Sequence, residues 1–156
     1  MQTGGFKSFL AKYYLFLAWI VAIVATGGSL YLSDVLKFDP CKLCWFQRIF
    51  MYPQVILLGI AAYRSDRRIV GYVLPLSIIG GLISLYHYAE EHIPALARVT
   101  PCTTGVPCNQ AYFELLGFIT IPFMAFVAFA LIALLLWRGS RAYDEVADAE
   151  FAYDEE

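Results

Sequence analysis

Charged residues are scarce in this chain. Only 15% of its 156 residues are Asp, Glu, Lys or Arg, whereas 60% are hydrophobic, and an ordinary soluble domain carries about 25% charged residues. The few basic residues form no patch suited to nucleic acid, and the sequence lacks a glycine-rich phosphate loop. We therefore expect no nucleic-acid partner, and the composition predicts a protein whose main partner is membrane lipid.

The hydrophobic residues fall into four runs, approximately 13–32, 45–63, 69–89 and 116–137. Each run is close to the roughly 20 residues that a helix needs to cross the hydrocarbon core. The first run is longer than the core of a signal peptide, so we expect it to stay as a membrane anchor. The very short link between the second and third runs makes them antiparallel neighbours. The sequence therefore predicts an all-α integral membrane protein, an up-down bundle of four transmembrane helices in a single domain, 1–141.

Basic residues predict the orientation of this bundle, because loops on the cytoplasmic side are enriched in Lys and Arg. One side of the predicted bundle carries Lys7, Lys12, Arg64, Arg67, Arg68, Arg138 and Arg141. The two loops on the other side carry Lys37, Lys42 and Arg98. Both termini are therefore expected in the cytoplasm, and the protein is expected to be a multi-pass protein of a cell membrane.

The C-terminal segment 142–156 contains seven of the thirteen acidic residues and no Lys or Arg. Such a composition is typical of a solvated segment, and we expect a disordered cytoplasmic tail. Within the spans, Gly27-Gly28, Gly59 and Gly80-Gly81 offer places where helices can approach closely.

The four cysteines all fall on the predicted outer side. Cys41 and Cys44 end the first extracytoplasmic loop, and Cys102 and Cys108 lie in the second. That compartment permits disulfides. Two structural disulfides are one interpretation, but a Cys-x-x-Cys pair closes a small ring and commonly exchanges readily. The first pair is therefore the stronger candidate for chemistry, whereas the second pair alone could be a loop staple.

Arg48 lies one helical turn after Cys44 and on the same face. Since Pro40 precedes the pair, Cys44 is expected in or near the first turn of a helix, where free backbone amides and the helix dipole favour a thiolate. A permanent positive charge at that depth is costly and points to a function. The alternative is that Arg48 extends toward the lipid headgroups. Trp45 and Phe46 could equally be interfacial aromatics or the wall of a site for a flat, lipid-soluble molecule.

Metal and haem chemistry receive little support from the spacing of the cysteines. A zinc site made of four cysteines needs two close pairs, and 57 residues separate Cys44 from Cys102. Covalent haem attachment needs a His after the second cysteine, where this chain has Trp45. We therefore expect no metal.

Together these features resemble the DsbB family of bacterial disulfide-forming membrane proteins, and most closely its BdbC branch. The segments that carry the resemblance are Gly28 to Tyr31, Pro40 to Arg48, Met51 to Pro53, Tyr72 to Pro75, His87-Tyr88 and Gly117 to Ala125. They span nearly the whole chain and are specific when taken together.

The resemblance implies a quinone-dependent protein thiol-disulfide oxidoreductase of the bacterial cell membrane. A reduced thioredoxin-fold partner similar to DsbA or BdbD would attack the loop disulfide at Cys102. Electrons would then pass from the Cys102/Cys108 pair to Cys41/Cys44, and from Cys44 to a bound menaquinone or ubiquinone. Arg48, Cys44, Trp45 and either His87 or His92 would lie near the quinone. The resting pairing of the four cysteines, in two local disulfides or one between loops, is left open.

Two alternatives compete with this hypothesis. One is a quinone-linked oxidoreductase similar to vitamin K epoxide reductase, which also combines a membrane Cys-x-x-Cys with loop cysteines. The other is a non-enzymatic four-span scaffold whose disulfides are inert to a reduced thioredoxin-fold protein.

Overall fold

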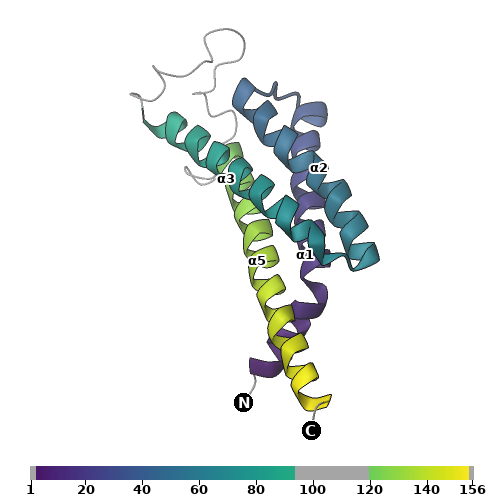
Figure 1. Ribbon diagram of the computed structural model, residues 1–156. Helices are drawn as coiled ribbons and strands as arrows, with labels where there is room; N and C mark the ends of the chain where they lie inside the picture. Colours follow the sequence, from purple (N-terminus) through teal and green to yellow (C-terminus); the bar gives the residue numbers. More distant parts are fainter. Residues whose placement is uncertain (1–2, 94–119, 155–156) are drawn as a thin grey trace.

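The computed structural model describes residues 3–93 and 120–154 (Figure 1). This part of the chain consists of four long helices, α1 (Thr3–Leu30), α2 (Lys42–Arg64), α3 (Val70–His92) and α5 (Ile121–Asp154). A π-helical stretch, Tyr31–Val35, extends α1, and a short 3-10 turn, Arg67–Ile69, precedes α3. Each of the four segments contains a stretch long and apolar enough to cross a membrane. The prediction of an all-α, four-span membrane protein is confirmed.

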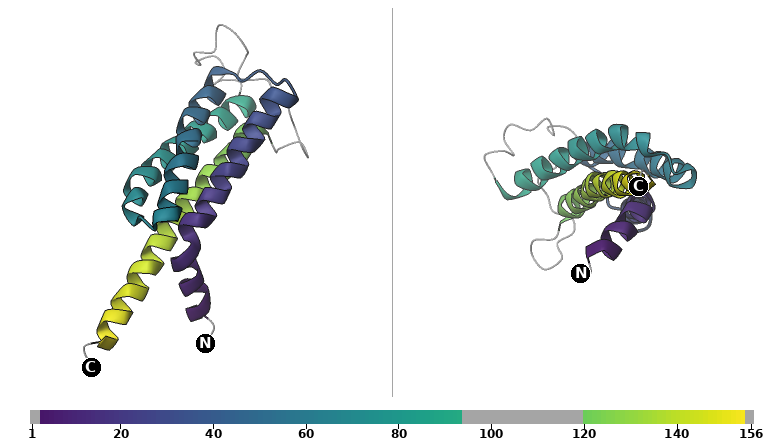
Figure 2. Two further views of the ribbon diagram at one scale, coloured as in Figure 1. Left: turned by 90° about the vertical axis from the view of Figure 1, so that its right-hand side faces the viewer. Right: turned by 60° about the horizontal axis from the view of Figure 1, so that its bottom comes forward.

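The four helices form a ring in which each packs extensively against two others. α1 packs against α2 and α5, and α3 packs against the same two helices, whereas α2 meets α5 only over a short stretch. The start of α1 and the end of α5 lie at one end of the bundle, and α2 begins at the opposite end (Figures 1 and 2). An ion pair between Lys7 and Glu145, 2.9 Å apart, joins α1 to α5 at the shared end. The up-down order predicted from the hydropathy pattern is therefore the observed one.

α5 is longer than the fourth predicted span at its C-terminal end. It continues as helix through Asp154, which differs from the disordered tail expected for 142–156. Alanine and glutamate favour helix, and Asp144 forms an ion pair with Arg67, with 3.0 Å between Oδ1 and Nη1. At the other end, the helix begins at Ile121, so Pro122 occupies the first turn, where its missing amide donor costs no hydrogen bond.

A tight turn fixes how α2 and α3 face each other. Ser65 ends α2 in the left-handed conformation, with φ 53°, and the Asp66 side chain accepts a hydrogen bond from the amide of Arg68. Further into the hairpin, the Ser77 hydroxyl donates a 3.0 Å hydrogen bond to Gln54 Oε1. Both side chains are fully buried, so the bond holds two polar groups together where lipid offers no alternative partner.

Two of the predicted glycine contacts are present, at Gly59 and Gly80. A Cβ atom on Gly59 would lie 2.8 Å from Trp19 Nε1, and one on Gly80 would overlap the ring of Phe129. No atom lies within 4 Å of a Cβ built on Gly27 or Gly28, so the expectation of close packing there is wrong. The glycines allow α1 to approach α2, and α3 to approach α5.

The substitution Gly80→Ala should destabilise the bundle by ~1–3 kcal/mol, because the added methyl would have to displace the buried Phe129 ring. Thermal unfolding of the detergent-solubilised protein would measure the loss. Gly71→Ala on the same helix is the matched control, since nothing lies within 4 Å of its Cβ, and it should be neutral or slightly stabilising. Equal stability of the two variants would contradict the close contact between α3 and α5.

Candidate active site

Cys41 is the N-cap of α2. Its backbone is extended, with φ −68° and ψ 174°, and its sulfur accepts a 3.5 Å hydrogen bond from the amide of Cys44. An oxygen of Ser, Thr or Asp usually fills this role. From the sequence, the free amides of the first turn are expected to act on Cys44. In the structure they act on Cys41, because the helix begins immediately after it, at Lys42.

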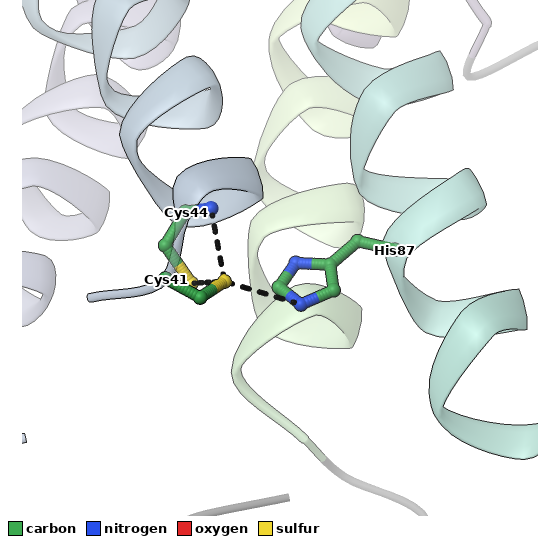
Figure 3. Close-up of side chains that lie close together, drawn as sticks. All are labelled: Cys41, Cys44 and His87. Carbon is green, nitrogen blue, oxygen red and sulfur yellow. Dashed lines mark hydrogen bonds between the residues drawn. The ribbon is translucent and has the colours of Figure 1, made fainter. Parts of the chain in front are cut away.

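Three reactive side chains converge at this end of the bundle. The Sγ atoms of Cys41 and Cys44 are 3.3 Å apart, and His87 Nε2 lies 3.6 Å from Cys41 Sγ. Figure 3 shows His87 pointing from α3 toward the two sulfurs at the start of α2. Cys41 and His87 are only 6% and 2% exposed. Of the two histidines that the sequence analysis left open, His87 is therefore the one beside the cysteines.

Gln47 completes the contact between the two helices. Its side-chain nitrogen lies 3.1 Å from His87 Nδ1, and both residues are buried. An amide N–H donated to Nδ1 leaves the proton of a neutral imidazole on Nε2, facing the sulfur of Cys41. The sequence analysis did not select Gln47. The available signal was a polar residue in an apolar run, one turn beyond Cys44.

These contacts stabilise Cys41 as a thiolate. The hydrogen bond from Cys44 contributes most, and the hydrogen bond of His87 and the amide of Cys44 add to it. Burial acts in the opposite direction, but together these contacts lower the pKa of the Cys41 thiol to about 4. A thiolate, not a thiol, is the nucleophile in disulfide exchange.

Arg48 turns inward from α2 toward α1. Its Nη2 donates a 3.2 Å hydrogen bond to the carbonyl oxygen of Ser29, and its guanidinium lies 5.4 Å from the centre of the Trp45 ring. The π-helical stretch that extends α1 begins two residues after Ser29. The guanidinium is thus held between α1 and α2 instead of extending freely toward the headgroups.

A cavity of about 630 Å³ lies next to the cysteines. Most of its lining is apolar and comes from 20–32 of α1 and its extension, Met51 and Tyr52 of α2, and 121–131 of α5. The polar side chains in its wall include those of Cys41, Cys44, Gln47, Arg48, His87 and Glu91. An apolar pocket of this size with a few convergent polar groups is typical of a site for a small organic molecule.

Some expected site residues do not join this group. Trp45 and Phe46 are half exposed and do not line the cavity. The Trp45 ring lies against Arg48, and the backbone amide of Trp45 donates a 3.1 Å hydrogen bond to the carbonyl oxygen of Cys41. His92 is exposed, and its Nδ1 lies 3.0 Å from the carbonyl oxygen of Tyr88 on its own helix. Cys102 and Cys108 lie outside the described residues.

Known proteins share this chain's pattern over most of its length. The family profile described as "Disulfide bond formation protein DsbB" matches residues 11–138. The chain belongs to the DsbB family. It is 50% identical to "Disulfide bond formation protein C" of Bacillus subtilis over 123 residues, which cover 79% of this chain and 89% of the relative. No solved structure gives a significant match.

A second group of relatives extends the match. The "Probable disulfide formation protein" of Coxiella burnetii is 46% identical over 137 residues, covering 87% of this chain and 93% of the relative. The resemblance to the BdbC-like branch is confirmed. Family membership makes the chain a membrane thiol-disulfide oxidoreductase that acts in disulfide bond formation.

The lowered pKa of Cys41 predicts an unusual pH dependence of alkylation. In the reduced protein, the rate at which iodoacetamide modifies Cys41 should be nearly constant between about pH 6 and about pH 8, because the thiolate is lost only as the pH falls through about 4. An ordinary thiol with a pKa of about 8.5 would react almost tenfold faster for each unit across that range. Mass spectrometry would assign the modified cysteine.

The substitution His87→Ala should raise the pKa of Cys41 and slow the reaction most at the acidic end of that range. His92→Ala, on the same helix but outside the cavity, is the control and should leave the profile flat. A profile that rises steeply with pH in the unsubstituted protein would contradict a stabilised thiolate at Cys41.

Proposed function

We propose that this protein reoxidises an extracytoplasmic thioredoxin-fold thiol oxidase similar to DsbA or BdbD and passes the electrons to a membrane quinone. The supporting observation is the apolar cavity of about 630 Å³ that has Cys44 and Arg48 in its wall. A quinone head group is flat, apolar and carries two oxygens. The cavity matches these properties through its aliphatic and aromatic lining and the guanidinium of Arg48.

The first half of the proposed reaction is thiol-disulfide exchange. The reduced partner attacks the Cys102/Cys108 disulfide at Cys102 and leaves as a disulfide, so that both loop cysteines become thiols. These thiols then reduce the Cys41/Cys44 disulfide through a mixed disulfide. Cys41 is the sulfur that meets the loop pair, and this leaves Cys44 next to Arg48 and the cavity.

The second half transfers two electrons out of the cysteine pair. The thiolate of Cys41 and the thiol of Cys44 form one S–S bond and give up two electrons and one proton, while quinone takes up the two electrons, that proton and one proton from water as quinol. Cys41, held as a thiolate, closes the disulfide on Cys44 as Cys44 gives up its electrons. His87 donates a hydrogen bond to Cys41, and Gln47 holds the imidazole in place. Arg48 stabilises negative charge that develops on sulfur or on a quinone oxygen.

The orientation of the bundle follows from the same proposal. Disulfide exchange with a secreted oxidase requires the start of α2 on the outer side of the membrane, and the distribution of basic residues supports that assignment. Both termini then lie in the cytoplasm of the bacterial cell.

A reconstituted reaction tests the proposal. Purified protein, a reduced thioredoxin-fold partner and either menaquinone or ubiquinone are mixed, while quinone absorbance and partner thiols are followed together. One quinone should be consumed for each pair of partner thiols, and Cys44→Ala should abolish the loss of quinone. Partner-independent quinone loss, or unchanged loss in Cys44→Ala, would overturn the proposal. A non-enzymatic scaffold would oxidise no partner thiols at all.

Arg48→Ala should lower the rate of quinone reduction by about 10²- to 10³-fold, the loss typical when one preorganised charge-stabilising donor is removed. Mixed-disulfide formation with the partner should change far less, because Arg48 contacts Ser29 and the cavity. Quenched-flow trapping of the mixed disulfide and quinone absorbance measure the two steps separately. Arg64→Ala, at the opposite end of α2, is the control. Equal loss in both steps would show that Arg48 supports the fold or the exchange step instead.

A further inference from the structure

The cluster at the start of α2 has the composition of a metal site as well as that of a redox centre. Cys41 and Cys44 are free thiols, and their sulfurs and a ring nitrogen of His87 all lie within 4.8 Å of one another. Two thiolates and one imidazole form a donor set that suits Zn²⁺, a borderline-soft cation without redox chemistry. From the sequence, only a zinc site made of the four cysteines can be considered, because the position of His87 depends on the packing of α3 against α2.

The distances are close to those of tetrahedral coordination. With Zn–S bonds of about 2.3 Å and Zn–N bonds of about 2.0–2.1 Å, two sulfurs on one ion lie about 3.8 Å apart, and a sulfur and a nitrogen about 3.6 Å apart. The corresponding separations are 3.3 Å between the sulfurs and 3.6 Å between Cys41 Sγ and His87 Nε2. Small rotations of the Cys44 and His87 side chains would bring all three donors onto one ion.

Gln47 suits the metal-bound state as well as the metal-free one. A histidine that binds zinc through Nε2 carries its proton on Nδ1 and usually donates it to an acceptor. The Gln47 amide already lies 3.1 Å from Nδ1, and turning it by half a rotation presents its oxygen in place of its nitrogen. The same side chain can therefore orient the ring in both states without leaving its buried position.

We propose that the reduced form of this protein binds one Zn²⁺ ion through Cys41, Cys44 and His87, and that the ion prevents the pair from forming its disulfide. Binding releases the protons that the two thiols still carry and transfers no electrons. The oxidised pair has no thiolate to offer, so zinc and the disulfide exclude each other. The binding site rests on the geometry of the dithiol, whereas its inhibitory effect on electron transfer rests on the function proposed above.

The binding test uses the full chain with Cys102→Ala and Cys108→Ala, so that no loop thiol can serve as a ligand. The reduced, detergent-solubilised protein is titrated anaerobically with Zn²⁺ in competition with a chromophoric chelator, and separately with Co²⁺. One equivalent of each ion should bind, and the Co²⁺ form should show tetrahedral d–d bands together with thiolate charge-transfer absorption. The oxidised protein should bind neither ion at this site. Equal binding to the reduced and oxidised forms would overturn the inference.

Substitutions assign the ligands. Cys41→Ser, Cys44→Ser and His87→Ala should each lower the affinity for Zn²⁺ by more than tenfold, and Gln47→Leu should lower it by about 10- to 100-fold, as is typical when the partner of a ligating histidine is lost. His92→Ala should leave the affinity unchanged. If His87→Ala keeps full affinity and both Cys41→Ser and Cys44→Ser keep the thiolate band, the ion binds elsewhere and the site is refuted.

The two proposals fail separately. Absence of redox-dependent zinc binding would overturn the metal site and leave partner-dependent quinone reduction untouched. Zinc binding with the predicted ligands in a protein that reduces no quinone would overturn the proposed function alone. If both hold, one equivalent of Zn²⁺ added to the reduced protein should slow quinone reduction, and a chelator should restore it.

Discussion

The rest of the site depends on one interaction, the hydrogen bond that the sulfur of Cys41 accepts at the start of α2. By accepting the amide of Cys44, this sulfur starts α2 at Lys42 and holds the two sulfurs on the same turn. The same atom contacts His87 of α3, so the start of one helix is tied to the end of another. Since a helix N-terminus favours negative charge, the structural cap and the nucleophile become a single group.

Hydropathy predicts the bundle well, because the requirements of a bilayer act on each span separately. The number of spans, the α2–α3 hairpin and the up-down order all follow from sequence. Local helix geometry also places Arg48 one turn beyond Cys44. The choice between His87 and His92 cannot be made this way, because it depends on how far α3 slides along α2. The C-terminal extension of α5 was missed for a related reason, since its ion pairs to Lys7 and Arg67 come from distant parts of the chain.

The cluster combines properties that oppose each other. A low thiol pKa and a neighbouring imidazole favour rapid exchange of disulfides, and the same features favour capture of a thiophilic cation. Arg48 adds positive charge to the wall of the cavity, which helps an electron-accepting oxygen and disfavours a cation. The proposed competition between a quinone and Zn²⁺ depends on the oxidation state of Cys41 and Cys44, because only the dithiol can reduce the one or bind the other.

The left-handed residue Ser65 has a consequence for how such a chain can change during evolution. A residue inserted in that turn would change the register that the turn sets between α2 and α3. Such a chain would keep every apolar run and every flanking charge, so the membrane would accept it with the same topology. His87 and Gln47 of such a chain would nevertheless face different neighbours. Insertion into the membrane and the geometry of the site thus depend on separate features of the chain. The turn at Ser65 lies at the other end of the hairpin from the sulfurs, yet it affects the geometry of the site without affecting membrane insertion.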